Sequence, residues 1–149
     1  MTTQYHTKFK NIRKDAILVV REVIKMGLFK KEKSLIEKKS LIQHLHNKMC
    51  EIYKLPTTII QYDETLYSSG RYNFETNTIT INKTSLVTYL HELCHNIRII
   101  KNLKNTEEIA RGWSISLYYL ATPKLCEKAI LDGKILFQNM MEAKENENI

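Results

Sequence analysis

One stretch of eight residues constrains this chain more than any other. The segment 89–96 has the sequence YLHELCHN and contains the pattern H-E-x-x-H at His91, Glu92 and His95. Two side chains four residues apart lie on the same side of a helix, one turn above the other. In a helix both imidazoles can therefore reach one metal ion. The sequence predicts half of a zinc site here.

The residues around this pattern favour a helix over 84–100. Its apolar residues recur at helical spacing. The apolar face comprises Leu86, Leu90, Leu93, Cys94, Ile97 and Ile100. We expect this face to be buried, with His91 and His95 at its edge. The alternative interpretation is a helix that carries two half-buried histidines and a surface glutamate, without a metal.

Glu92 stands between the two histidines. Beside a zinc ion, a glutamate can take a proton from a zinc-bound water whose pKa the metal has lowered to about 7. We therefore predict that Glu92 is the general base of a hydrolytic reaction.

A catalytic zinc ion usually has three protein ligands, so the histidine pair requires a third. The polar segment 101–105 predicts a chain reversal, after which Thr106 can cap a new helix. Running back antiparallel, this helix would bring its first turn level with His95. Glu107 and Glu108 are the candidate ligands. Acidic residues in a first turn also favour the helix dipole, and Glu108 suits a capping role better.

These residues resemble the gluzincin group of zinc metallopeptidases, in which a glutamate on a second, antiparallel helix completes the H-E-x-x-H site. That helix often carries E-x-x-A, which the segment 107–110 (EEIA) matches with Glu107 in the ligand position. Trp113 and Ser114 then fall where intracellular ImmA/IrrE-like members tend to have Phe-Ala. Many such families have an acidic residue four positions after the ligand, where this chain has Arg111. The resemblance covers roughly residues 70 to 120.

The resemblance implies a Zn²⁺-dependent metallopeptidase that acts on peptide or protein substrates, as an endopeptidase rather than an exopeptidase. His91, His95 and Glu107 would hold the metal, with Glu108 as the alternative third ligand. A tyrosine or an arginine is expected to stabilise the oxyanion, and the sequence does not choose among Tyr118, Tyr119 and Arg111.

The sequence predicts a single α+β domain over residues 1–149 with flexible tails at 1–7 and 142–149, and the resemblance implies a zincin-like arrangement of its elements. In the first half, helices are expected over 9–29, with Gly27 near the end, and from Ser34 to before Pro56. In the second half, helices are expected from Thr106 and from Pro123 to about Asp132, followed by a last amphipathic stretch over 134–141. Three strands are expected at 57–62, 71–74 and 78–81, the last two as a hairpin. One strand would form an edge beside the active site, able to bind an extended peptide.

Composition limits the partners and the compartment. The net charge of +7 allows a nucleic-acid partner, although lysine also serves simply to solvate helices. The alternative function is therefore a basic nucleic-acid-associated or regulatory binding module with a structural or vestigial metal site. We expect an intracellular, cytoplasmic protein without a membrane span, and free buried thiols at its three cysteines. We expect His44 and His46 at the surface or rim.

Overall fold

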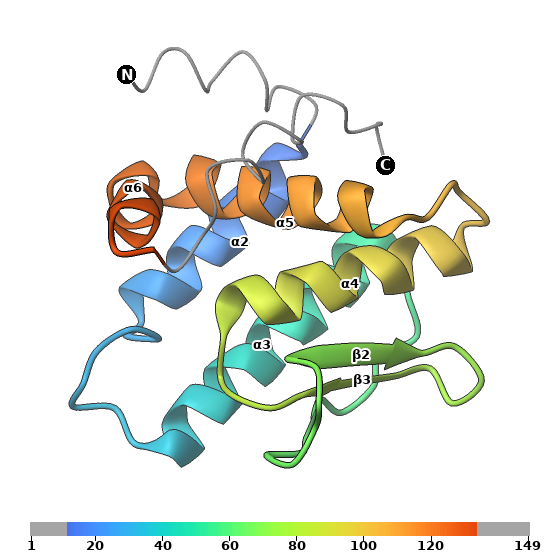
Figure 1. The fold of residues 1–149 in the computed structure, drawn as a ribbon, viewed down its shortest axis with the longest axis horizontal. Helices are drawn as coiled ribbons and strands as arrows, with labels where there is room; N and C mark the ends of the chain where they lie inside the picture. Colours follow the sequence, from blue (N-terminus) through green and yellow to red (C-terminus); the bar gives the residue numbers. More distant parts are fainter. Residues whose placement is uncertain (1–11, 134–149) are drawn as a thin grey trace.

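The structure is a computed structural model that describes residues 12–133 as an α+β fold. The described residues form five helices and one small sheet (Figure 1). The helices are α2 (Lys14–Lys25), α3 (Leu35–Tyr53), α4 (Leu86–Ile100), α5 (Glu107–Ala121) and α6 (Pro123–Leu131). The strands are β1 (Gln61–Tyr62), β2 (Gly70–Asn73) and β3 (Thr78–Ile81).

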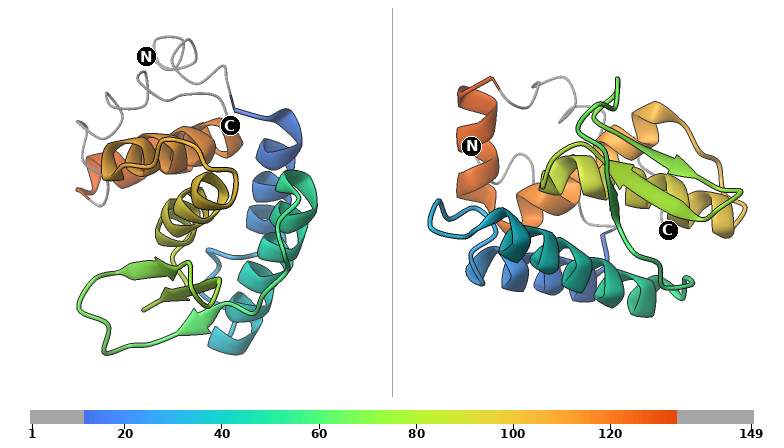
Figure 2. Two further views of the ribbon diagram at one scale, coloured as in Figure 1. Left: turned by 90° about the vertical axis from the view of Figure 1, so that its right-hand side faces the viewer. Right: turned by 90° about the horizontal axis from the view of Figure 1, so that it is seen from below.

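Helix α4 lies in the middle of the molecule, between α5, the sheet and the α2–α3 pair (Figure 2). It begins after Ser85, whose hydroxyl accepts a hydrogen bond from the backbone N–H of Thr88. The predicted apolar face is buried except at Ile100, which is exposed. Leu90, Leu93 and Ile97 are fully buried, and each contributes about 1.5–3 kcal/mol of hydrophobic stabilisation. The histidine-bearing helix is therefore fixed by its own core contacts.

The sheet has the strand order β1-β3-β2. Strands β2 and β3 form the predicted antiparallel hairpin, paired from Gly70↔Ile81 to Asn73↔Thr78. The turn includes Asn77 in the left-handed conformation (φ 50°), which asparagine tolerates better than most residues. Strand β3 is central, and β2 is an edge strand that packs against α4.

The predicted strand over 57–62 is wrong for its first four residues, because β1 comprises only Gln61–Tyr62. The side chain of Gln43, on α3, explains the difference. Its amide nitrogen donates to the carbonyl of Thr58 and its amide oxygen accepts from the N–H of Ile60. These backbone groups are thus satisfied by a side chain instead of a neighbouring strand.

The first two helices follow the predicted pattern with different bounds. Helix α2 covers Lys14–Lys25 and is shorter than the predicted 9–29, of which residues 9–11 lie outside the described part. It ends because Gly27 takes a left-handed backbone conformation (φ 108°) just after the cap. Helix α3 begins with a capping box between Ser34 and Glu37.

Near the C-terminus, α6 begins at Pro123 as predicted and ends at Leu131. The predicted amphipathic stretch at 134–141 and the predicted tails at 1–7 and 142–149 lie outside the described residues. Among the helices within 12–133, none is long and apolar enough to cross a membrane.

The predicted surface position of His46 is wrong, because its side chain is fully buried between α3 and α4. Its Nδ1 is hydrogen-bonded to the Tyr89 hydroxyl at 2.8 Å and its Nε2 to the Thr58 hydroxyl at 3.2 Å. The sequence gives no sign of these partners, because both are distant along the chain from His46. Burial lowers the pKa of His46 to about 4, so that the ring is neutral at neutral pH.

This burial predicts a loss of stability in mild acid. His46 has a pKa of about 4 in the folded chain and about 6.5 when unfolded, so only the unfolded state binds the proton between these values. Its contribution of about 3 kcal/mol is present above pH 6.5 and is lost progressively as the pH falls to 4. Thermal melting across this range should show a flatter pH dependence for His46→Gln than for the parent. The control, His44→Gln, should keep the parent slope, and an equal flattening in both variants would contradict this account.

Candidate metal centre

The antiparallel hairpin of α4 and α5 brings three predicted ligands together. The Nε2 atom of His91 lies 3.0 Å from Oε1 of Glu107, and the Nε2 atom of His95 lies 2.7 Å from Oε2 of the same carboxylate. The two imidazole rings are 5.0 Å apart between centroids. One potential ligand atom from each of the three residues lies within 4.8 Å of the others.

The turn between the helices sets this alignment. Helix α4 ends in a Schellman motif, in which Asn102 is left-handed (φ 56°) and the N–H of Leu103 donates to the carbonyl of Arg98. The buried side chain of Arg98 donates a hydrogen bond from Nε to the carbonyl of Lys104. These bonds fold the loop back so that α5 begins beside the last two turns of α4.

The two candidate glutamates take different places at the start of α5. Thr106 is the N-cap, and its hydroxyl accepts from the N–H of Ile109, so neither glutamate closes a capping box. Glu107, in the first helical position, faces the histidines. Glu108 is exposed and does not belong to the three-residue group. The geometry thus favours Glu107 over Glu108.

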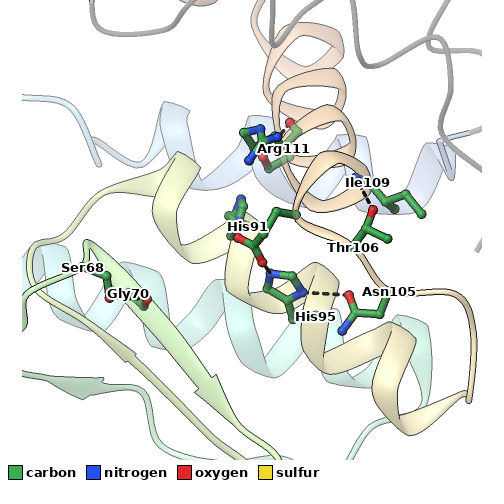
Figure 3. A network of polar contacts seen from close by, with 10 residues as sticks. Ser68, Gly70, His91, His95, Asn105, Thr106, Ile109 and Arg111 are labelled. Atoms are coloured by element: carbon green, nitrogen blue, oxygen red, sulfur yellow. Dashed lines mark hydrogen bonds and ion pairs between the residues drawn. The ribbon is translucent and has the colours of Figure 1, made fainter.

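Asn105 forms a hydrogen bond with His95 on the side of the ring that faces away from Glu107. Its Oδ1 lies 2.7 Å from Nδ1 of His95 (Figure 3). An amide oxygen only accepts hydrogen bonds, so Nδ1 donates to it, and Nε2, which faces Glu107, is the atom that would coordinate a metal. Outer partners of this kind orient metal-binding histidines. Asn105 could not be predicted from the sequence, because nothing in the polar turn distinguishes it from its neighbours.

We expect Asn105→Ala to weaken zinc binding by about 10–100-fold, the usual cost of losing such an outer partner. The change removes the acceptor at His95 Nδ1 without touching a ligand atom. Competition with a chromogenic chelator measures the affinity. Asn105→Asp keeps an acceptor in place and should stay close to the parent. Parent-like affinity in Asn105→Ala would contradict the positioning role.

The electrostatics favour a neutral His91 imidazole and a charged Glu107 carboxylate. Burial lowers the pKa of His91, against the opposing hydrogen bond to Glu107. Partial burial acts to raise the pKa of Glu107, but the hydrogen bonds and electrostatic attraction from His91 and His95 outweigh it and lower the pKa. These are the protonation states that metal coordination requires.

Glu92 is buried beside this group, with 7 % of its surface exposed. Burial raises its pKa to about 7, while His95 and a backbone hydrogen bond from Tyr72 on β2 act in the opposite direction. A carboxyl group with a pKa near neutrality can both accept and return a proton. The general base predicted from the sequence therefore lies in an environment suited to proton transfer.

Gly70 lets the edge strand approach Glu92 closely. A β-carbon at this position would lie 2.9 Å from the methyl group of Thr88 and 3.1 Å from Cγ of Glu92. Ser68 and Gly70 lie on the sheet side of the site, and Arg111 lies on the α5 side (Figure 3). Between them is a pocket of about 320 Å³, lined also by His91, Glu92 and Glu107. We call it the metal pocket.

The donor set fits a zinc ion. Two imidazole nitrogens and one carboxylate oxygen are typical catalytic zinc ligands. In a tetrahedral site with bonds of about 2.0 Å, ligand atoms are about 3.3 Å apart. The 2.7 and 3.0 Å distances from the histidine nitrogens to Glu107 lie near this value, and the widest separation in the group, up to 4.8 Å, must close when an ion binds. The Glu107 side chain is 65 % exposed, which leaves one side of the centre accessible from the metal pocket.

Comparisons with known proteins identify no relative. No family model matches the chain, and neither the curated proteins nor the solved structures include a significant match. The function proposed below therefore depends on the chain's own residues and their geometry.

Proposed function

We propose that this chain is a zinc-dependent metallopeptidase with a zincin-like centre. The observation that carries the proposal is the convergence of His91, His95 and Glu107 within 4.8 Å, with Glu92 buried beside them. Four residues of the required chemistry come from two helices that the chain packs against each other. A helix with two incidental histidines would not require an outer acceptor on one histidine and a carboxylate shared by both.

His91, His95 and Glu107 would hold the ion, and Asn105 would orient His95. Bound zinc would supply Lewis-acid polarisation of the scissile carbonyl and lower the pKa of a water molecule. Its positive charge would also lower the pKa of Glu92, which favours the carboxylate form needed to accept a proton. Glu92 takes the proton of the attacking water and then passes it to the leaving amine.

Arg111 is the best placed of the three candidates for oxyanion stabilisation. It lines the metal pocket one turn after Glu107. Tyr119 is fully buried, and Tyr118 lines a different pocket. A guanidinium group at this edge can donate hydrogen bonds to a carbonyl oxygen that becomes negative during the reaction.

We expect Arg111→Ala to lower kcat by about 10²-fold, the typical effect of losing one such donor, while the zinc content stays unchanged. Kinetics on a fluorogenic peptide measure the change. Arg111→Lys keeps the charge and should recover part of the loss. An unchanged kcat in Arg111→Ala would remove this residue from the reaction.

Strand β2 is suited to orient a peptide. It is an edge strand that faces the metal pocket at Gly70. An extended substrate can pair with the main-chain groups of such an edge, and this pairing requires no particular substrate sequence. The lack of a β-carbon at Gly70 keeps the edge close to Glu92.

The experiment that tests the proposed function is hydrolysis of an unfolded protein by the zinc-loaded chain, followed by mass spectrometry of the products. Peptide-bond cleavage that stops with a chelator and returns with added zinc is expected. No cleavage by a chain shown to hold one zinc would contradict the proposal.

The net charge of +7 leaves the nucleic-acid alternative as a prediction from composition. It predicts DNA binding that falls steeply with salt and is unaffected by Glu92→Gln. Electrophoretic mobility shifts at two salt concentrations test it.

A further inference from the structure

A second, larger pocket lies beside the metal pocket. It has a volume of about 560 Å³ and is formed by α6, the first turn of α4, the end of α5 and the loop after α2. We call it the α6 pocket. The first turn of α4 and the helix α6 lie on the same side of the molecule (Figures 1 and 2).

The two pockets share a wall. Val87 and Thr88, in the first turn of α4, line both of them. His91 and Glu92 follow one turn later on the same helix and line the metal pocket. A ligand in the α6 pocket would therefore touch the same turn of α4 that lines the metal pocket.

The walls of the α6 pocket combine apolar and polar side chains, with the apolar surface slightly the larger. Leu86 and Tyr118 are buried at the pocket, and Ala129 contributes a small side chain. Phe29 and Leu125 also line it and remain 41 % and 37 % exposed, so each can be covered further by an apolar group that enters the pocket.

The charged groups at the α6 pocket favour an acidic partner. Lys31 and Lys128 both line it and are exposed, against one acidic residue, Asp132. None of the ion pairs among residues 12–133 involves either lysine. Both ammonium groups can therefore pair with carboxylates of a ligand.

We propose that the α6 pocket is a substrate subsite that receives a bulky apolar side chain of an extended polypeptide, with a neighbouring acidic residue paired to Lys31 and Lys128. This inference rests on the proposed peptidase function and specifies its substrate class. A substrate that reaches from the metal pocket past Val87 and Thr88 into the α6 pocket extends beyond the scissile bond, which suits an endopeptidase. Substrates are then acidic–apolar segments of polypeptides.

The test uses three fluorescein-labelled peptides on a Gly-Ser backbone and the full chain with Glu92→Gln, which is expected to bind substrates without cleaving them. The peptides carry a central Leu between two Glu, a central Leu between two Lys, or a central Gly between two Glu. Fluorescence anisotropy should show that the Glu-Leu-Glu peptide binds at least about tenfold tighter than the peptide with a central Gly, the effect of one buried apolar side chain. It should also bind tighter than the Lys-flanked peptide, because its carboxylates can pair with Lys31 and Lys128.

Two variants locate the binding in the α6 pocket. Ala129→Trp fills the pocket and should remove the preference for Leu over Gly. Lys128→Glu should reverse the preference for acidic flanks. Lys124→Glu is the matched control, because it makes the same charge change on an exposed residue of α6 that does not line the pocket. Circular dichroism checks the fold of each, and the surface change at Lys128 keeps the test valid if Ala129→Trp fails to fold.

Equal affinity for the three peptides would overturn the inference. Identical effects of Lys124→Glu and Lys128→Glu would also overturn it, because they would show that the peptide is attracted by the general charge of the surface and not by the α6 pocket. The anisotropy is measured with zinc and again with chelator, and zinc is quantified separately. Failure of the proposed function appears as a parent chain that lacks zinc, or that holds zinc without cleaving, whereas failure of this inference appears as absent peptide selectivity when the zinc-loaded parent does cleave.

Discussion

Replacement of Glu92 by glutamine is expected to abolish peptide hydrolysis while leaving the metal in place. The amide has nearly the same shape as the carboxylate but cannot accept the proton of the attacking water. General-base catalysis contributes about 10²–10⁴-fold to such reactions, so the rate should fall by at least about 10². Glu92 does not belong to the three-residue ligand group, so its replacement should not release zinc.

Cleavage of a fluorogenic peptide by zinc-loaded parent and variant measures this effect. Glu108→Gln makes the same chemical change at an exposed glutamate outside the metal group and should retain the parent rate. Parent-like hydrolysis by the Glu92→Gln variant would remove Glu92 from the mechanism and leave the base unidentified.

The second large effect concerns stabilisation of the fold by zinc. An ion that binds only the folded chain, at a hundred times its dissociation constant, stabilises it by about 2.7 kcal/mol. For a chain of this size, the expected rise in Tm is about 5–10 °C. His95→Ala removes one of three ligands together with the imidazole that Asn105 orients. We expect this variant to melt at the same temperature with and without zinc.

Scanning calorimetry with and without zinc measures the shift. His44→Ala is the control, because His44 lies on α3 outside the metal group, and it should show the full rise. A zinc-induced rise that persists in His95→Ala would show that the ion binds elsewhere.

The core of the candidate site could be predicted because its geometry is local. The pair His91 and His95 share one face of a helix by spacing alone. A five-residue polar turn after α4 limits where the next helix can start, which places Glu107 near the pair. The apolar periodicity of α3 and α4 similarly identified both helices, and the structure bears out the α+β class.

The rest depends on contacts between residues far apart in the sequence. Gln43 reaches from α3 to take the backbone groups of Thr58 and Ile60, which shortens the expected strand. His46 is buried because α4 packs over it, a consequence of tertiary packing that α3 alone does not show. Arg111 could be distinguished from the two tyrosines only once the pocket beside Gly70 was visible.

The most direct test of the account is the zinc content of the purified chain, determined by elemental analysis beside Glu107→Ala and Glu108→Ala. We predict about one zinc per chain in the parent and in Glu108→Ala, and none in Glu107→Ala. Zinc retained in Glu107→Ala but lost in Glu108→Ala would contradict the ligand assignment. A parent chain without zinc after supplementation would contradict the metallopeptidase account itself.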